Sequence, residues 1–488
     1  MPVLLRPHWP LRLPASLCLV SLAALLAGCA ATAPHPAPRL DLPTAFAHEQ
    51  GWLATSALEQ APPDTLHAHW WQVYADPALD ALLQQVTQDN ATLEQASAQW
   101  RQAEAAVAAA RASRYPQLDG DASASRSGDS DSRAQSRLAS TLSIGWLPDL
   151  WGRTALQTQA SAAQAQAAAA NLAATQLALQ LTAAEQYTSL RRLALDARLL
   201  EQTLAAYARS LSLTQNQYDA GLVARADVIQ AQIQHESVRN QMATNQQQQA
   251  LARNALALLA GTTAAQWGWK LPDDAPLPEP PAIPRQLVAS LLLQRPDIAA
   301  ASQSVAAANA RLGVAQTAWL PDIRLNASAG LQGSGWSQFI ESPLRVWSLG
   351  PTLAASLFDG GSRRAATAQA QADYDAQAAA WRAAVLQAVQ EVEDALASAQ
   401  WLHTRQAHQQ QLLQLSRDNL RVVQNQYEAG MVSYLDVVTA QNLALTSQRS
   451  ALELQAQRLQ ASMQLVAALG GGWQGRAATS TVALTPGS

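Results

Sequence analysis

The feature that most constrains this chain is an internal repeat. The segment NQYDAGLV at 216–223 recurs as NQYEAGMV at 425–432, and an Asp-Val pair follows each copy. The offset is 209 residues at every matched position, as residues 216 and 425 illustrate. A match of this length that keeps one spacing indicates duplication. The chain is therefore two copies of one unit of about 200 residues.

Each copy predicts the same order of elements. An Ala-rich helix comes first, then a Ser/Gly-rich pair of strands, a long helix, a Gly-containing turn and a returning helix. The expected ranges are 77–114, 117–149, 153–216 and 224–259 in the first copy, and 287–318, 321–358, 363–427 and 433–469 in the second. Helices of such length need coiled-coil-like packing, and leucines recur every seven residues along 433–469. The predicted fold is mainly α, with four β-strands in each chain.

The flanking segments complete the expected division of the chain. We expect a lipoprotein signal peptide at 1–28, a lipid-anchored linker at 29–64, the first repeat at 65–261, a Pro-rich connector at 262–286, the second repeat at 287–469 and a flexible tail at 470–488. Because prolines favour extended backbone, the connector is expected to lie outside any core.

The N-terminus predicts lipid attachment. Two arginines precede an apolar stretch that is too short for a membrane-spanning helix and is typical of a signal peptide. It ends in Leu26-Ala27-Gly28-Cys29, which resembles the lipobox of bacterial lipoproteins, in which the Cys thiol carries a diacylglycerol. Ala30 follows instead of the Asp that marks inner-membrane retention, so the outer membrane is expected. The other cysteine, Cys18, lies in the signal, which leaves no disulfide in the mature chain.

The Ser/Gly-rich segments alternate between apolar and polar residues. In 321–332 the side chains of Ile323, Leu325 and Ala327 share a face opposite Arg324 and Asn326, and 347–357 alternates in the same way. Runs of about ten residues with this pattern, and with tryptophans at their ends, are typical of membrane strands. Four strands cannot close a barrel, and an open edge is excluded from lipid because its backbone groups go unpaired. A membrane role therefore requires several chains, and three is the smallest number that leaves a pore.

Composition excludes several other function classes. The net charge is -4, only 14% of residues are charged, and no basic block suggests a nucleic-acid partner. The chain has no P-loop and no dinucleotide-binding glycine pattern. Since no catalytic or metal-ligand constellation stands out either, we expect neither an enzyme nor a cofactor.

Several short motifs in order carry a family resemblance. They are Trp70-Trp71, Asp76-Pro77-Ala78-Leu79, Asn90-Ala91-Thr92-Leu93, Arg295-Pro296-Asp297-Ile298 and the paired Tyr-x-Ala-Gly sequences at Tyr218 and Tyr427. With these motifs the chain resembles the TolC-like outer-membrane factors, and its N-terminus resembles their NodT-type lipoprotein branch. The resemblance implies a homotrimer with a twelve-strand membrane β-barrel and a long α-helical barrel below it. It also implies a passive exit duct for small molecules, with a periplasmic adaptor and an inner-membrane RND-type transporter as partners.

The resemblance also implies site residues at the periplasmic tip. Tyr427, Leu435 and Asp436 of the second copy are the expected gate, with a ring of Asp436 carboxylates attracting cations. Thr439 stands where some relatives carry a further acid, so a doubled acidic ring is not expected. The expected hairpin turns and adaptor contacts are Gly221, Leu222, Val223, Gly430, Met431 and Val432.

Two alternatives to the efflux duct remain open at this stage. One is the outer-membrane duct of a type I protein secretion system. The other is a periplasmic coiled-coil scaffold lipoprotein that never crosses the membrane. The sequence does not indicate which substrate is exported.

Overall fold

A computed structural model of the chain describes residues 46, 69–128, 134–272, 276–281, 292 and 294–471. The predicted signal peptide, Cys29 and the tail beyond residue 471 lie outside them. The described chain forms two compact units. One contains residues 102–165 and 303–379, and the other contains residues 69–101, 166–302 and 380–471.

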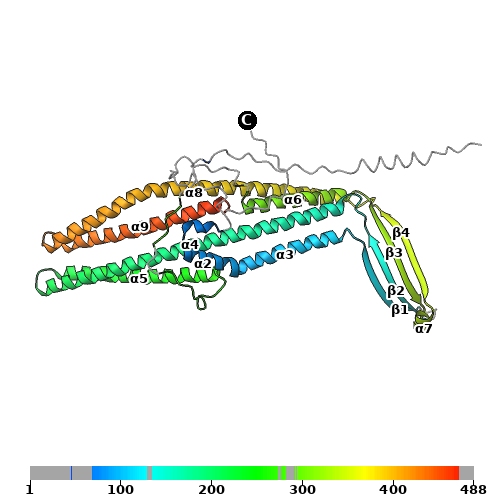
Figure 1. Cartoon of the computed structure of the whole chain (residues 1–488), viewed down its shortest axis with the longest axis horizontal. Coiled ribbons are helices and arrows are strands. Elements are labelled where there is room, and N and C mark those ends of the chain that lie inside the picture. The colour runs from blue at the N-terminus through cyan, green and yellow to red at the C-terminus, as the bar shows by residue number, and fades with distance from the viewer. Residues whose placement is uncertain are drawn as a thin grey trace, which may run out of the picture. The chain divides into compact units, whose positions relative to one another are not determined.

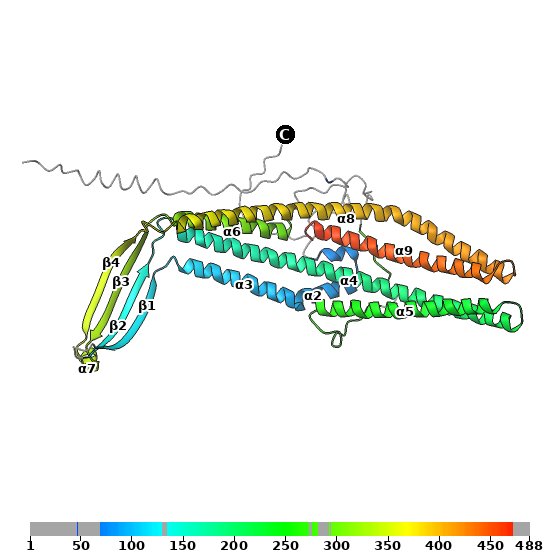
Figure 2. The same ribbon diagram turned by 180° about the vertical axis from the view of Figure 1, so that it is seen from behind.

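The first unit carries a four-stranded antiparallel sheet in the order β1-β2-β3-β4 (Figures 1 and 2). Its strands are β1 (Gln117–Ser127), β2 (Gln135–Trp146), β3 (Asp322–Gly333) and β4 (Leu344–Ala354), and the short helix α7 (Trp336–Glu341) connects the last two. Each repeat supplies two neighbouring strands, as predicted. The strand predicted over 347–357 begins earlier and ends at Ala354, so Leu357 lies beyond it in irregular backbone and is almost fully exposed.

The register aligns the alternating pattern across all four strands. Leu118 pairs with Ile144, Ile144 with Ala327, and Ala327 with Leu349, which makes one continuous apolar face. The neighbouring row runs through Asp119, Ser143, Ser328 and Ser348, and the hydroxyls of Ser328 and Ser348 lie 2.8 Å apart. Since successive residues of a strand point to opposite faces, the sheet has one apolar and one polar surface.

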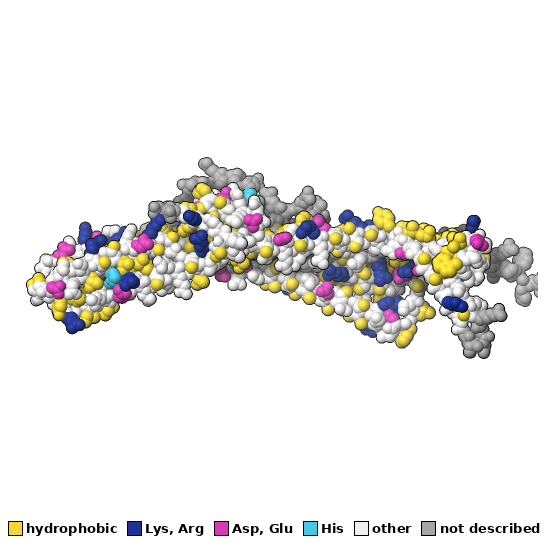
Figure 3. Space-filling model, turned by 90° about the horizontal axis from the view of Figure 1, so that it is seen from below, with side chains coloured by type: hydrophobic (Ala, Val, Ile, Leu, Met, Phe, Trp, Pro, Cys, Tyr) yellow, Lys and Arg dark blue, Asp and Glu magenta, His cyan; other side chains and the backbone are white. Residues whose placement is uncertain are grey.

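The four long helices form two hairpins in the predicted places. The first hairpin is α4 (Arg153–Asp219) with α5 (Arg225–Leu259), and the second is α8 (Ser362–Glu428) with α9 (Tyr434–Ala468). Both α4 and α8 have 67 residues, and both returning helices have 35. Identical lengths in the two halves confirm the repeat. The face of the molecule drawn in Figure 3 shows hydrophobic side chains scattered among few charged groups.

The helix predicted over 77–114 is two helices, because Asn90 interrupts it. These are α2 (Pro77–Asp89) and α3 (Ala91–Ala112), preceded by the 3-10 turn η3 (Trp70–Tyr74). Asn90 has an extended ψ of 122°, and its Oδ1 accepts the backbone N–H groups of Thr92 and Leu93 at 2.9 and 3.2 Å. Asparagine in this role starts a new helix instead of continuing the old one.

The helix predicted over 287–318 begins later than expected. Helix α6 runs from Pro296 to Thr317, while Leu292 and Gln294 lie in 3-10 backbone. Residues 287–291 and 293 lie outside the described residues. Proline restricts the residue before it to extended backbone, so Pro296 marks the helix start.

The largest buried cluster joins η3 and α2 to parts of α4, α5 and α9. It contains Trp70, Trp71, Leu82 and Tyr187 together with Trp267 and Leu277 of the Pro-rich connector. The indoles of Trp267 and Trp269 stack with ring centroids 5.0 Å apart. The prediction that the connector lies outside any core was therefore wrong. Trp267 and Trp269 precede the first proline of the connector, and Leu277 lies between Pro276 and Pro278, so the prolines do not keep these apolar residues from packing.

Within the described residues, no helix combines the length and the apolar character needed to cross a membrane.

Candidate functional site at the hairpin tips

The two hairpins turn in the same way, each at a glycine. Gly221 has φ +75° and Gly430 has φ +73°. The backbone N–H of Leu222 donates to the carbonyl of Gln217 at 2.8 Å, and the N–H of Met431 donates to the carbonyl of Gln426 at 2.9 Å. A glycine in the left-handed region with this reach-back bond ends a helix and reverses the chain.

An aspartate holds the start of each returning helix, but the two do so unequally. The Oδ2 of Asp436 accepts both the backbone N–H and the hydroxyl of Ser433, at 3.0 and 2.7 Å. In the first hairpin the Oδ2 of Asp227 accepts only the backbone N–H of Ala224, at 3.3 Å. A carboxylate at this position also interacts favourably with the helix dipole. Asp436 thus has a local structural role, and its exposed side chain remains open to solvent.

Two tyrosines connect the second hairpin to the first. The Tyr427 hydroxyl donates to Oε1 of Gln217 at 2.9 Å, and the hydroxyls of Tyr434 and Ser210 lie 3.2 Å apart. The two tyrosine rings lie 5.6 Å apart, centroid to centroid. Burial raises the pKa of both phenols, so both remain protonated near neutral pH. Of the three predicted gate residues, Tyr427 is therefore the one that contacts the other hairpin.

The remaining predicted tip residues lie mostly at the surface. Leu222 is 75% exposed, Met431 72% and Leu435 62%, whereas Val223 and Val432 are half-buried. These three exposed side chains are apolar, and exposed apolar side chains that lie together are typical of a surface that contacts another protein. The structure of one chain does not bring Leu435 and Asp436 against any other predicted gate residue.

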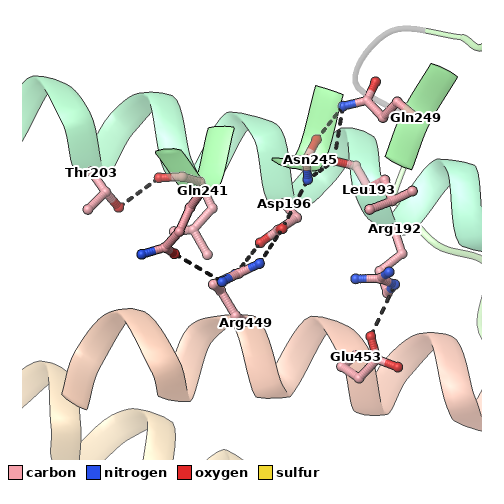
Figure 4. Close-up of polar contacts among 10 residues, drawn as sticks. Arg192, Leu193, Asp196, Thr203, Gln241, Asn245, Gln249, Arg449 and Glu453 are labelled. Atoms are coloured by element: carbon pink, nitrogen blue, oxygen red, sulfur yellow. Dashed lines mark hydrogen bonds and ion pairs between the residues drawn. The ribbon is translucent and has the colours of Figure 1, made fainter. Parts of the chain in front are cut away.

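Farther from the turns, an ion pair with a buried carboxylate joins the hairpins, and nothing in the sequence predicts it. Arg449 of α9 donates from Nε and Nη2 to both oxygens of Asp196 on α4, at 2.8 and 2.9 Å (Figure 4). Asn245 of α5 donates to the same carboxylate at 3.0 Å, and Gln241 accepts from Arg449 at 3.0 Å. The Asp196 side chain is only 4% exposed. The carboxylate raises the pKa of Arg449. We call this contact the Asp196–Arg449 clamp.

Two of the short motifs that carry the family resemblance make hydrogen bonds at the ends of helices. Asp76 begins α2 by accepting the N–H of Ala78 at 3.0 Å, and its other oxygen accepts from Tyr187 at 2.8 Å and from Arg191. Arg295 donates to the carbonyl of Ala468 at 2.9 Å, at the end of α9. Asp76 and Arg295 therefore position helices, whereas the tip residues Gly221, Tyr427 and Gly430 belong to the paired Tyr-x-Ala-Gly motifs.

Among the residues that the structure covers, no three His, Cys, Asp or Glu side chains are grouped as metal ligands would be. The chain matches the family described as "Outer membrane efflux protein" over residues 82–262 and 287–471, one match for each repeat. It belongs to the outer membrane efflux protein family. Its location is the outer membrane, and its role is that of an efflux component, as the sequence resemblance predicted.

Individual relatives cover nearly the same length. The "Solvent efflux pump outer membrane protein SrpC" of Pseudomonas putida is 31% identical, over 82% of this chain and 87% of its own. The "Cation efflux system protein CusC" of Escherichia coli O157:H7 is 28% identical, over 94% of this chain and 99% of its own. The crystal structure of the open state of the Neisseria gonorrhoeae MtrE outer membrane channel superposes with a TM-score of 0.78 at 26% identity, covering 91% of this chain and 99% of that one. The names of SrpC and CusC refer to different exported substances, solvent in the first and cations in the second.

Proposed function

We propose that this chain is the exit duct of a tripartite efflux pump, a homotrimer that spans the outer membrane and meets a periplasmic adaptor and an inner-membrane RND-type transporter at its hairpin tips. The structure of the four-stranded sheet is the main support for this proposal. It has one apolar face and two unpaired edges, β1 and β4, within the described residues.

The dimensions of the strands suit a membrane. Strands of 11 and 12 residues are about 36–40 Å long. A tilt of about 45° reduces this to roughly the height of the hydrocarbon layer. The apolar face carries Trp347, Leu349 and Leu353, which are 79%, 77% and 67% exposed. Lipid would cover this face, and neighbouring copies would pair the free edges, so that three chains close twelve strands into a pore.

Electrical recording tests the duct. Purified protein in a planar bilayer is expected to give discrete conductance steps. A variant with Tyr427→Phe and Ser210→Ala, which removes one hydrogen bond at each tyrosine between the hairpins, is expected to give larger or more frequent steps. No steps from either protein, when both are assembled as oligomers, would contradict the proposal.

The proposed gate makes a separate prediction. Asp436→Asn is expected to lower the preference for cations, because it removes the charge but keeps an oxygen that can accept the Ser433 N–H. Asp227→Asn in the first hairpin is the matched control, and it is expected to leave ion selectivity unchanged. Reversal potentials in a salt gradient measure both. Equal effects of the two substitutions would remove Asp436 from its proposed role.

The proposed lipid anchor predicts a mass. Cys29 of the mature protein is expected to carry a diacylglycerol and an N-terminal acyl chain such as palmitate, and intact-mass spectrometry would show the added hydrocarbon. Cys29→Ser is expected to lose this mass. Unmodified Cys29 in the wild-type protein would rule out the anchor while leaving the duct proposal in place.

A further inference from the structure

The apolar face of the sheet carries charge at one end only. An even number of residues separates Arg126 from Leu118 along β1, and Arg345 from Leu349 along β4, so both arginines share the face of those leucines. Among the described strand residues on this face, Arg126 and Arg345 are the only charged ones. The rest of the face consists of apolar and small residues.

No carboxylate of the strands neutralises these two charges. The aspartates of the sheet, Asp119, Asp121 and Asp322, all lie on the polar face. Both arginine side chains are exposed, and neither makes an ion pair with a residue that the structure describes. Two guanidinium groups are therefore open to a partner from outside the chain.

Both arginines lie at the end of the strands where α7 connects β3 to β4 (Figure 1). The opposite end of each strand leads to the helices α3, α4, α6 and α8. Trp347 follows Arg345 on the same face and is 79% exposed, and α7 exposes Trp336 and Ile340, at 69% and 72%. Exposed tryptophans beside basic residues are typical of the surface of a bilayer.

The length of the strands places the two charges at the edge of the apolar band. From Leu353 to Arg345, β4 rises about 26 Å, and from Leu118 to Arg126, β1 rises by the same amount. Leu357, just beyond β4, extends the apolar surface away from Arg345. A lipid-facing arginine is costly in the middle of a bilayer and nearly free of cost at its surface. Both arginines therefore lie at the level of the lipid headgroups when the apolar rows lie in the hydrocarbon layer.

We propose that Arg126 and Arg345 bind phosphate groups of the phosphorylated glycolipid, lipopolysaccharide, that forms the outer leaflet of the membrane. The inference rests on the proposed membrane-spanning sheet and names the lipid that the outer end of that sheet recognises. It assigns a binding role to two residues that neither line the pore nor lie at the hairpin tips.

The chemistry of the surface favours a lipid phosphate. A guanidinium group presents paired N–H donors that match two oxygens of one phosphate. Trp347 and Leu349 continue the row from Arg345 and are 79% and 77% exposed. The acyl chains of a lipid whose phosphate is bound to Arg345 would cover these two side chains. A free phosphate ion would leave them bare.

Binding of purified lipid A, the phosphorylated anchor of lipopolysaccharide, tests the proposal. Fluorescent lipid A is titrated with the full-length protein in an uncharged detergent without divalent cations. The variant Arg126→Gln/Arg345→Gln is expected to bind about thirtyfold more weakly than the wild type, because each arginine near an anionic membrane surface contributes about a factor of five. Lipid A from which both phosphates have been removed should bind the two proteins equally.

A matched control removes the same charge from the other face of the sheet. Arg137 and Arg324 lie on the polar face, so Arg137→Gln/Arg324→Gln is expected to bind lipid A as the wild type does. Equal loss of binding in the two double variants would overturn the assignment to the apolar face. Displacement of lipid A by an equal concentration of inorganic phosphate would overturn the lipid as the ligand.

Conductance of the same wild-type preparation separates this inference from the proposed duct. Discrete steps from a protein that binds lipid A no better than its dephosphorylated form would overturn the phosphate contact and leave the duct intact. Absence of steps from the assembled protein would overturn both.

A gain of binding keeps the test decisive if the double variant fails to assemble. Ser136 pairs with Arg126 on the apolar face, and Ser127 lies at the same end on the polar face. Ser136→Arg is expected to strengthen lipid A binding about fivefold, and Ser127→Arg is expected to leave it unchanged. The same gain from both substitutions would contradict a site on the lipid-facing surface.

Discussion

Replacing Asp76 with alanine is expected to destabilise the protein by about 4 kcal/mol, the largest effect of any single substitution considered. The side chain accepts two backbone N–H groups at the start of α2, a role worth about 1 kcal/mol. It is also the carboxylate partner of Arg191, whose side chain is only 6% exposed. An unpaired buried cation costs about 3 kcal/mol more. The Nε of Arg191 already lacks a partner among the described residues, and without Asp76 its Nη1 would keep the neutral Tyr187 hydroxyl, at 2.7 Å, but no carboxylate.

Two further variants separate these contributions. Asp76→Asn keeps an oxygen for the helix start but removes the charge, and it should recover only about 1 kcal/mol of the loss. Asn90→Ala removes a helix-starting side chain that has no ionic partner, and it should cost about 1–2 kcal/mol. Urea unfolding followed by the helical circular dichroism signal measures all three. An Asp76→Ala protein no less stable than Asn90→Ala would show that the Arg191 pair contributes little.

Replacing Arg449 with methionine is expected to cost about 2–4 kcal/mol, because it leaves the Asp196 carboxylate buried with only the Asn245 amide beside it. The value lies below the cost for a fully buried pair because the Arg449 side chain is 39% exposed and partly screened. Hydrogen exchange is the most informative measurement, since amides of α4 and α9 near the clamp should lose protection first.

The controls for this prediction are a neutralised pair and a surface pair. Arg449→Met combined with Asp196→Asn should be more stable than Arg449→Met alone, because no buried charge remains. Arg421→Met removes an exposed ion pair with Asp418 on α8 and should change stability by less than about 0.5 kcal/mol. Equal costs for Arg421→Met and Arg449→Met would contradict a structural role for the clamp.

The fold could be predicted from the sequence largely because it is repeated. The 209-residue offset, the heptad leucines of α9 and the alternating residues of β3 each repeat a local pattern whose period fixes the element. The break at Asn90 could not be read in this way. An asparagine in a helix-forming stretch can either continue the helix or start a new one. The role of Asn90 as a helix start is evident only from the structure, in which its side-chain amide donates to the carbonyl of Leu259, 169 residues away.

Only those features of the candidate site that depend on local sequence could be predicted. The turns at Gly221 and Gly430 and the exposed aliphatic residues beside them follow from local sequence. The partners of Tyr427 and Arg449 do not, because Gln217 and Asp196 lie 210 and 253 residues away in the chain. The connector was misjudged because its six prolines suggested solvent exposure, whereas Trp267, which precedes them, and Leu277, which lies between two of them, are apolar enough to be buried.

The most direct test of the central claim, that the sheet crosses the outer membrane while the hairpin tips stay in the periplasm, is thiol labelling of intact cells. Ser337→Cys places a thiol on α7, at one end of the strands, and Ala429→Cys places one at a hairpin turn. With a membrane-impermeant maleimide, Ser337→Cys is expected to label in intact cells, and Ala429→Cys only after the outer membrane is permeabilised. Protection of both thiols until permeabilisation would contradict the duct and identify the chain as a periplasmic scaffold.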